Sequence, residues 1–227
     1  MPVSRILLSW SGGKDAAWAL HQLRRSGGGD VVGLMSAMVP EFDRISMHGV
    51  RTDLVRAQAH AAGLPLIEVG LPWPCSNAIY EAEFLSSLSA ARAEFGVTHV
   101  AFGDLFLEDV RAYRERLLQG TGLAPLFPLW GQPTDSLLQA MLAGGVRARI
   151  VCLDPARLDR HFAGRELDAA TAAELPPGVD PCGERGEFHT FVTHGPMLST
   201  PVAVEAGEVV ERDGFVYADL LAAPIHV

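Results

Sequence analysis

The sequence predicts an α/β fold in which a doubly wound, mostly parallel sheet precedes a smaller α+β domain. In the first half of the chain, short apolar runs alternate with helical patterns, and this alternation implies right-handed βαβ units. Glycine and proline cluster between residues 120 and 133, where we expect the chain to pass between domains. The remainder is β-rich. We therefore divide the chain into residues 1–122 and residues 123–227.

The elements of the first half follow from the spacing of apolar residues. Residues 6–8 form an apolar run that is typical of a buried strand, and after the glycine turn apolar residues recur at helical intervals. The same alternation continues to residue 102. The predicted strands cover residues 5–9, 31–39, 65–69 and 99–102, and the predicted helices cover residues 16–25, 50–62 and 77–95.

Beyond residue 122, the patterns are more mixed. Thr134 is placed to cap a helix over residues 134–143. Near the end of the chain, Arg-Asp-Gly at 212–214 is typical of the turn of a hairpin, which we predict over residues 208–217. The other predicted elements are strands over residues 147–153, 188–192 and 202–204, and a helical stretch over residues 155–175.

The composition excludes several classes of protein. Hydrophobic residues make up 48% of the 227 residues, which is enough to bury a core and excludes a disordered chain. The net charge of −9 argues against nonspecific nucleic-acid binding, which needs an excess of Lys and Arg. Three widely spaced cysteines give no disulfide framework and no zinc site. The apolar run at residues 6–8 is too short for a signal peptide or a membrane span, so we expect a soluble, cytoplasmic protein.

The most informative segment joins the first predicted strand to the first predicted helix and reads S-W-S-G-G-K-D. Its glycines let backbone N–H groups approach phosphate oxygens, and the helix that follows adds its positive dipole end. A lysine supplies a point charge, and an aspartate can hold Mg²⁺ against the phosphates. The spacing fits neither a Walker loop nor a dinucleotide loop. The predicted nucleotide-binding residues here are Ser9, Ser11, Gly12, Gly13, Lys14 and Asp15, with Asp15 as the metal ligand.

A second motif lies at residues 180–190 and reads D-P-C-G-E-R-G-E-F-H-T. It places Glu184 and Glu187 around a glycine immediately before a predicted strand. Paired carboxylates at such a turn can orient an amine or act as a base in acyl transfer. The same string is also compatible with an ordinary solvated turn, so this motif by itself leaves both interpretations open.

Together, the two motifs resemble the diphthine–ammonia ligase family of PP-loop ATP pyrophosphatases. S-G-G-K-D resembles the PP-loop, and residues 183–190 resemble the family's G-E-G-G-E-[FY]-E-T-like string. The segments at 47–51, 58–59, 63–65 and 103–104 also match, so the resemblance spans nearly the whole chain. It implies a Rossmann-like PP-loop domain at 1–122, a substrate-binding domain at 123–227, and cleavage of ATP to AMP and pyrophosphate. The acyl adenylate of a carboxylate would then be attacked by ammonia.

The resemblance also assigns residues to roles. Ser36 and Gly103 would join the nucleotide-binding set, and Asp104 would act with Lys14 in catalysis and hold magnesium. Glu184 and Glu187 would be catalytic and face the acceptor, with His48 and His189 also lining the substrate side. The implied partners are ATP, Mg²⁺, an unidentified carboxylate acceptor and ammonia, with no nucleic acid or membrane and with a possible homodimer.

Several residues depart from the family pattern. Ala16 stands where the PP-loop usually has Ser or Thr, which removes one hydroxyl donor to phosphate. Arg185 and His189 replace a Gly and a Glu, and both replacements resemble a bacterial branch of the family. Two alternative functions remain open. Ala16 indicates a noncatalytic nucleotide-binding sensor, and Cys182, which lies in the second motif, indicates a sulfur-transfer enzyme.

Overall fold

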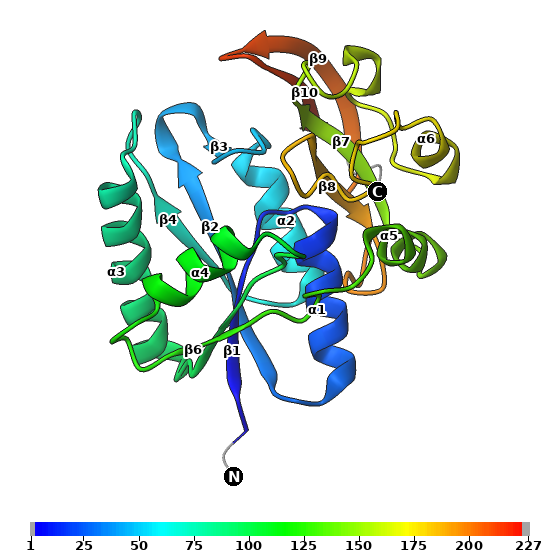
Figure 1. The fold of residues 1–227 in the computed structure, drawn as a ribbon. Helices are drawn as coiled ribbons and strands as arrows, with labels where there is room; N and C mark the ends of the chain where they lie inside the picture. The colour runs from blue at the N-terminus through cyan, green and yellow to red at the C-terminus, as the bar shows by residue number, and fades with distance from the viewer. Residues whose placement is uncertain (1–2, 224–227) are drawn as a thin grey trace.

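A computed structural model describes residues 3–223 and contains two β-sheets (Figure 1). The strands of the first sheet are β1 (Arg5–Ser9), β2 (Asp30–Val39), β3 (Arg44–Ile45), β4 (Leu66–Gly70), β5 (His99–Ala101) and β6 (Ala124–Leu126). Their order is β3-β2-β1-β5-β6, and β4 also pairs with β2. Only the pairing of β2 with β3 is antiparallel in this sheet, among the residues that the structure describes. The predicted α/β class is therefore confirmed.

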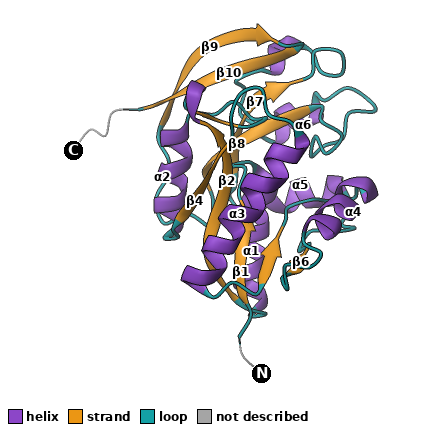
Figure 2. Cartoon of the chain, turned by 90° about the vertical axis from the view of Figure 1, so that its left-hand side faces the viewer, coloured by secondary structure: helices purple, strands orange, loops and turns teal. Residues whose placement is uncertain are grey.

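Helices lie against both faces of the first sheet, as a doubly wound fold requires (Figure 2). They are α1 (Lys14–Ser26), α2 (Thr52–Ala62), α3 (Asn77–Phe95) and α4 (Glu108–Leu117). Ile6 and Leu8 of β1 pack in one core cluster with α1 and α2, whereas Leu7 packs in another cluster with Phe84 and Leu88 of α3. Successive side chains of a strand point to opposite faces, so a continuous apolar run is what a sheet buried on both faces needs.

The second half of the chain forms a four-stranded antiparallel sheet. Its elements are α5 (Thr134–Ala143), β7 (Arg147–Leu153), a 3₁₀ turn η2 (Arg160–Phe162), α6 (Ala169–Ala173), β8 (Phe188–His194), β9 (Val204–Arg212) and β10 (Phe215–Ala222). The strand order is β8-β7-β10-β9. Asp213 and Gly214 join β9 to β10 with φ angles of 52° and 82°, as a tight hairpin turn requires. The predicted hairpin is confirmed.

Three predictions for the second half are wrong in detail. Thr134 does not cap α5; its hydroxyl donates to Asp180 Oδ2 at 2.8 Å. The predicted helical stretch over residues 155–175 contains only η2 and α6. It breaks at Gly164, whose φ is 81°, because the chain there bonds to β7: the N–H of Gly164 donates to the carbonyl of Ile150 at 2.8 Å. The strand predicted over residues 202–204 begins only at Val204.

The sequence patterns missed three elements of the first sheet's layer, namely β3, β6 and α4, as well as the short 3₁₀ turn η1 (Pro40–Phe42). Two of the three, β3 and β6, are strands of two and three residues, too short to show a period. β6 follows residue 122, where we placed the domain boundary, yet it pairs with β5 in the first sheet. The first sheet therefore extends at least to Leu126.

The two halves pack closely against each other. One core cluster contains residues from α1 and α2 together with residues from β7, β8 and β10. Backbone bonds also cross the contact: the N–H of Val192 in β8 donates to the carbonyl of Gly12 at 2.9 Å. Within residues 3–223, none of the helices combines the length and apolar character needed to cross a membrane. The second half therefore lies directly beside the loop that contains Gly12.

Candidate active site

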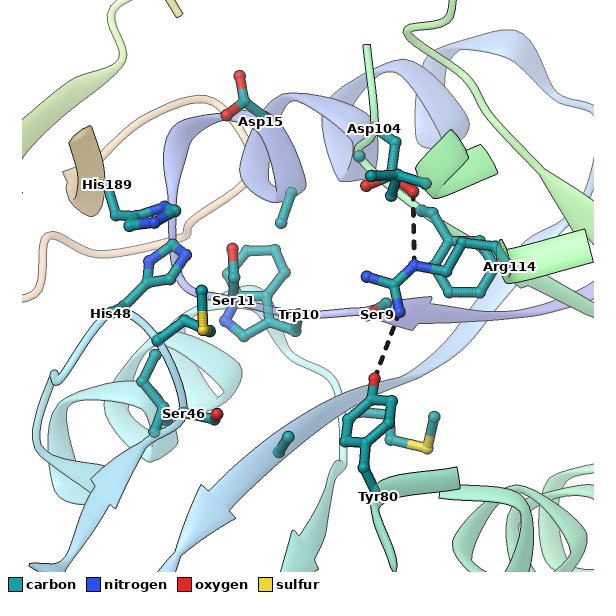
Figure 3. Close-up of a pocket in the computed structure, with 18 of the residues that line it drawn as sticks. Ser9, Trp10, Ser11, Asp15, Ser46, His48, Tyr80, Asp104, Arg114 and His189 are labelled. Carbon is teal, nitrogen blue, oxygen red and sulfur yellow. Dashed lines mark hydrogen bonds and ion pairs between the residues drawn. The ribbon is translucent and has the colours of Figure 1, made fainter. Parts of the chain in front are cut away.

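A cleft of about 870 Å³ opens where β1, β2 and β5 end and where the second half meets the first. Ligands of parallel α/β sheets bind at the carboxyl ends of the strands, so this is the expected place. Of the predicted site residues, those that line the cleft are Ser9, Ser11, Lys14, Asp15, His48, Gly103, Asp104, Glu184 and His189. Residues far apart in the sequence thus face one cavity, part of which Figure 3 shows.

The conformation of the loop after β1 is fixed by a buried side chain of α2. Gly12 has a φ of 76°, in the region that favours glycine, and a Cβ there would lie 2.8 Å from Gln58 Oε1. Gln58 is fully buried. Its amide accepts from Trp10 Nε1 at 3.0 Å and donates to the carbonyls of Gly12, at 3.0 Å, and Val192, at 2.6 Å. One side chain of α2 therefore fixes the loop and attaches it to β8.

Lys14 is only 2% exposed, although it begins a helix. Its ammonium donates to Asp15 Oδ2 at 2.9 Å and to the carbonyl of Cys182. Burial opposes the charged form, but the nearby negative charges of Asp15 and Glu184 outweigh it and raise the pKa of Lys14. The ammonium therefore stays charged in the cleft and links the loop to the second motif.

The two glutamates of the second motif have different environments. Glu184 lines the cleft, accepts from the N–H of Leu105 at 2.7 Å, and has a pKa that burial raises to about 7. Glu187 is 2% exposed and accepts from the N–H groups of Asp180, at 3.1 Å, and Arg185, at 2.9 Å. It is absent from the cleft lining among the described residues. Glu187 stabilises its own turn through these hydrogen bonds. The predicted contact of Glu187 with the acceptor is therefore not supported by its position.

Gly103 and Asp104 follow β5 and lie beside the phosphate loop. A Cβ at Gly103 would lie 3.0 Å from the backbone N of Ala16 and the backbone C of Asp15, which explains the glycine. Burial raises the pKa of the Asp104 carboxyl. Figure 3 shows Asp104 facing Arg114 of α4, with Nε and Oδ2 3.6 Å apart, and Arg114 in turn bonded to Tyr80.

His48 and His189 stack against each other on the other side of the loop (Figure 3). Their ring centroids are 4.5 Å apart, and Nδ1 of His48 lies 3.2 Å from the carbonyl of Thr190. A carbonyl only accepts, so this nitrogen carries the proton and Nε2 keeps a lone pair. Burial lowers the pKa of His189 to about 4 and that of His48 well below 6.5. Both rings are therefore neutral near pH 7.

Family comparisons agree with this geometry. The model described as the diphthamide synthase N-terminal domain matches residues 4–125, and the model described as the diphthamide synthase C-terminal domain matches residues 133–219. The chain belongs to the diphthamide synthase family. The family that the motifs predict is thereby confirmed.

The chain resembles curated relatives of this family, two of which match it over most of their own length. The diphthine–ammonia ligase of Bos taurus is 25% identical over 94% of this chain and 88% of its own. That of Danio rerio is 26% identical over 95% and 90%. The Homo sapiens protein of the same name is 30% identical over 54% of this chain and 48% of its own. These names support the predicted ATP-dependent ligase that adds ammonia.

Neither alternative is favoured by these findings. Cys182 is 1% exposed, and burial raises the pKa of its thiol to about 12, so the nucleophilic thiolate is not formed near neutral pH. Its Sγ instead lies 3.5 Å from the carbonyl of Thr134. The sensor hypothesis rests on Ala16, which lines the cleft, but the relatives are named as ligases.

Three of the predicted nucleotide-binding residues shape the phosphate loop and do not line the cleft. Ser36 is 1% exposed and donates its hydroxyl to the carbonyl of Trp10. In the described part of the chain, the cleft lining also omits Gly12 and Gly13. The Gly13 N–H points to Ser11 Oγ at 3.3 Å. Their contribution is to the conformation of the loop, which the sequence pattern does not separate from ligand contact.

The motifs missed other residues of the site. Arg114 and Tyr80 line the cleft from α4 and α3, and Thr190 lines it while its hydroxyl accepts from the Lys14 N–H at 3.1 Å. The helical spacing of the apolar residues at 107, 110 and 117 could have revealed α4, and with it Arg114 on the turn beside Asp104. No short motif marks Tyr80.

Proposed function

We propose that the chain is an ATP-dependent ligase that adenylates a carboxylate, releases pyrophosphate, and transfers ammonia to the acyl group. Lys14 carries this proposal. It is the only lysine among the 18 Lys and Arg residues of the sequence, and it is buried against the phosphate loop, where its ammonium meets Asp15 and the second motif. Lysine carries a compact point charge on a flexible stem, which suits a buried position that meets phosphate oxygens.

Lys14 would stabilise the charge that develops on the departing pyrophosphate. The bond between the α- and β-phosphates breaks as the acceptor carboxylate attacks the α-phosphorus, so negative charge grows on the leaving group. An ammonium fixed in a water-poor site lowers the energy of that transition state more than the energy of bound ATP. The hydroxyls of Ser9 and Ser11 lie along the same wall of the cleft and can donate to the same oxygens.

Asp15 and Asp104 would hold Mg²⁺ together with the phosphates. Asp15 Oδ1 and Asp104 Oδ2 are buried without a hydrogen-bond partner, which is costly unless a ligand satisfies them. Residues 3–223 contain no cluster of three or more metal-binding side chains. The two carboxylates of Asp15 and Asp104 suit Mg²⁺, which binds through one or two carboxylates and completes its shell with water and substrate phosphate. When bound, the ion would neutralise phosphate charge.

Glu184 would take the proton that the incoming nitrogen loses. Ammonia attacks the acyl carbon with its lone pair, and the nitrogen must lose a proton before AMP departs with the electrons of the C–O bond. A carboxyl whose pKa is about 7 is partly ionised at neutral pH and suited to accept that proton. The rings of His48 and His189 line the same cleft. Because both rings are neutral, they place no positive charge beside an uncharged nucleophile.

The acceptor would enter from the side of β3. A second cavity of about 160 Å³ lies between β3 and the β9–β10 hairpin, and Ser46, Met47 and Trp73 line both cavities. The name of the relatives gives diphthine as their ammonia acceptor; for this chain we propose a carboxylate acceptor whose apolar part contacts Met47 and Trp73, which are 69% and 56% exposed.

To test this proposal, the purified protein is incubated with α-labelled ATP, magnesium and ammonium, with and without a metabolite extract. The labelled products AMP and ADP are then separated and measured. We expect labelled AMP that depends on the extract and is lost in Lys14→Ala. We also expect loss in Lys14→Arg, because the larger guanidinium cannot fill the buried position. Labelled ADP would overturn the proposal. Tight binding of ATP that is never cleaved would favour the sensor, and the Lys14 variants should keep the wild-type circular dichroism spectrum.

A further inference from the structure

Arg114 lines the cleft opposite the phosphate loop and has no role in the chemistry described above. Its side chain is 21% exposed, and its guanidinium lies over the rings of Phe102, at 5.0 Å, and Tyr113, at 5.8 Å. Nη1 points to the hydroxyl of Tyr80 at 3.3 Å. Aromatic faces and one bond thus hold a planar cation at the edge of the nucleotide cleft.

The ion pair of Arg114 with Asp104 is incomplete. Nε and Oδ2 are 3.6 Å apart, too far for a hydrogen bond, and both atoms are buried without a partner. Buried polar atoms are nearly always bonded, so the pair is arranged for something that is not part of the protein. In Figure 3 another nitrogen of the same guanidinium points across the cleft toward the phosphate loop.

We propose that Arg114 binds the α-phosphate of the nucleotide, with the Tyr80 hydroxyl and the Phe102 ring as the groups that position it. The proposal rests on ATP being the substrate. Lys14 stands at the loop, where the leaving pyrophosphate would lie, and Arg114 stands on the facing wall formed by α4. A guanidinium offers two parallel N–H groups to one phosphate. Arg114 would therefore hold the phosphorus that the acceptor attacks.

Binding of AMP and of adenosine separates a phosphate contact from a structural one. AMP carries the α-phosphate and adenosine does not, and neither supports turnover. We expect Arg114→Met to weaken AMP binding, measured by calorimetry with the full chain, about tenfold or more, because a charge-assisted bond pair is lost. Adenosine binding should stay within twofold of wild type.

Arg111 provides the matched control. It lies one turn earlier on α4, stacks on Phe127 and Trp130, and pairs with Glu115. Among the described residues it does not line the cleft. Arg111→Met should therefore leave AMP binding unchanged. An AMP affinity that falls no further in Arg114→Met than in Arg111→Met would overturn the proposal, as would an equal loss of adenosine binding.

A conservative variant covers the case in which Arg114→Met leaves Asp104 uncompensated and does not fold. Arg114→Lys keeps a charge beside Asp104 but loses the planar fork, and it should weaken AMP binding severalfold while adenosine is unaffected. Wild-type AMP affinity in this folded variant would count against a bidentate contact. The binding assay needs no turnover, so its failure would leave AMP formation from ATP intact, and an inactive ligase would leave the binding result interpretable.

Discussion

The phosphate loop over residues 9–15 and the turn over residues 180–190 are the two motifs of the cleft, and they use their polar residues differently. In the loop, Ser9, Ser11, Lys14 and Asp15 all line the cleft, and support comes from outside, from Gln58 of α2. In the turn, support comes from inside: Glu187 bonds the N–H groups of its own motif, and Glu184 alone of the two glutamates lines the cleft.

The difference has a physical origin. A loop between a strand and a helix is fixed at both ends, so a few hydrogen bonds from neighbouring elements, made by Gln58, Ser36 and Thr190, set its shape. The turn before β8 contains glycines at 183 and 186, both with positive φ, and its backbone N–H groups need an acceptor to avoid being buried unpaired. The carboxylate of Glu187 is that acceptor. Two residues of one type in one motif therefore have unlike functions.

The largest expected effect separates the two glutamates. Glu184→Gln should lower the rate of AMP formation about a hundredfold, because it removes the proton acceptor in the cleft, with little change in the melting temperature. Glu187→Gln should instead lower the melting temperature by about 3–8 °C, since a charged acceptor of two buried N–H groups is lost.

Thermal unfolding and a labelled-ATP assay on the same preparations measure both effects. The folded fraction of Glu187→Gln should turn over at nearly the wild-type rate. Equal losses of rate in the two variants would show that both carboxylates act on the substrate and would remove the distinction between them.

A second effect is a tenfold change in rate per pH unit. Since burial raises the pKa of Glu184 to about 7, kcat/KM should rise with pH up to about 7 and then level off, as the ionised base accumulates. Its ordinary pKa is 4.5, so between about pH 4.5 and 7 the folded protein binds this proton more tightly than the unfolded chain. Stability from this group therefore falls as pH rises through that window.

Glu184→Gln should remove both trends, which a pH series of rates and of unfolding midpoints would test. Glu187→Asp is the control, because it keeps a carboxylate in the turn and leaves Glu184 in place. A rising limb of the rate profile that persists in Glu184→Gln would assign the base to another group.

The smallest expected effect concerns the loop. Ala16 lines the cleft, and Ala16→Ser would add a hydroxyl donor where the resembling PP-loops carry one. A hydrogen bond contributes about 0.5–1.5 kcal/mol net, so the KM for ATP should fall about two- to tenfold. An unchanged KM, measured by initial rates of pyrophosphate release, would mean that Ser9 and Ser11 already satisfy the phosphates.

Much of this molecule could be predicted from local pattern. The strand at 5–9, the helix at 77–95, the helix at 134–143 and the strand at 147–153 are predicted to the residue, because a glycine or proline follows shortly after the end of each. The strands β3 and β6 were missed because they are short. The stretch at 155–175 was wrongly predicted as helical because its backbone bonds to β7, a pairing that the local sequence does not indicate.

The sequence by itself determined the parallel α/β class, the phosphate loop and the family, because a strand, a glycine turn and a helix each depend on residues that are adjacent in the sequence. Only the tertiary structure decided which polar groups face the cleft. Ser36 and Glu187 turn inward to satisfy buried backbone groups, while Arg114, Tyr80 and Thr190 reach the cleft from elements distant in the chain. The direction of a side chain depends on which buried atoms need a partner, and those atoms are brought together only by packing.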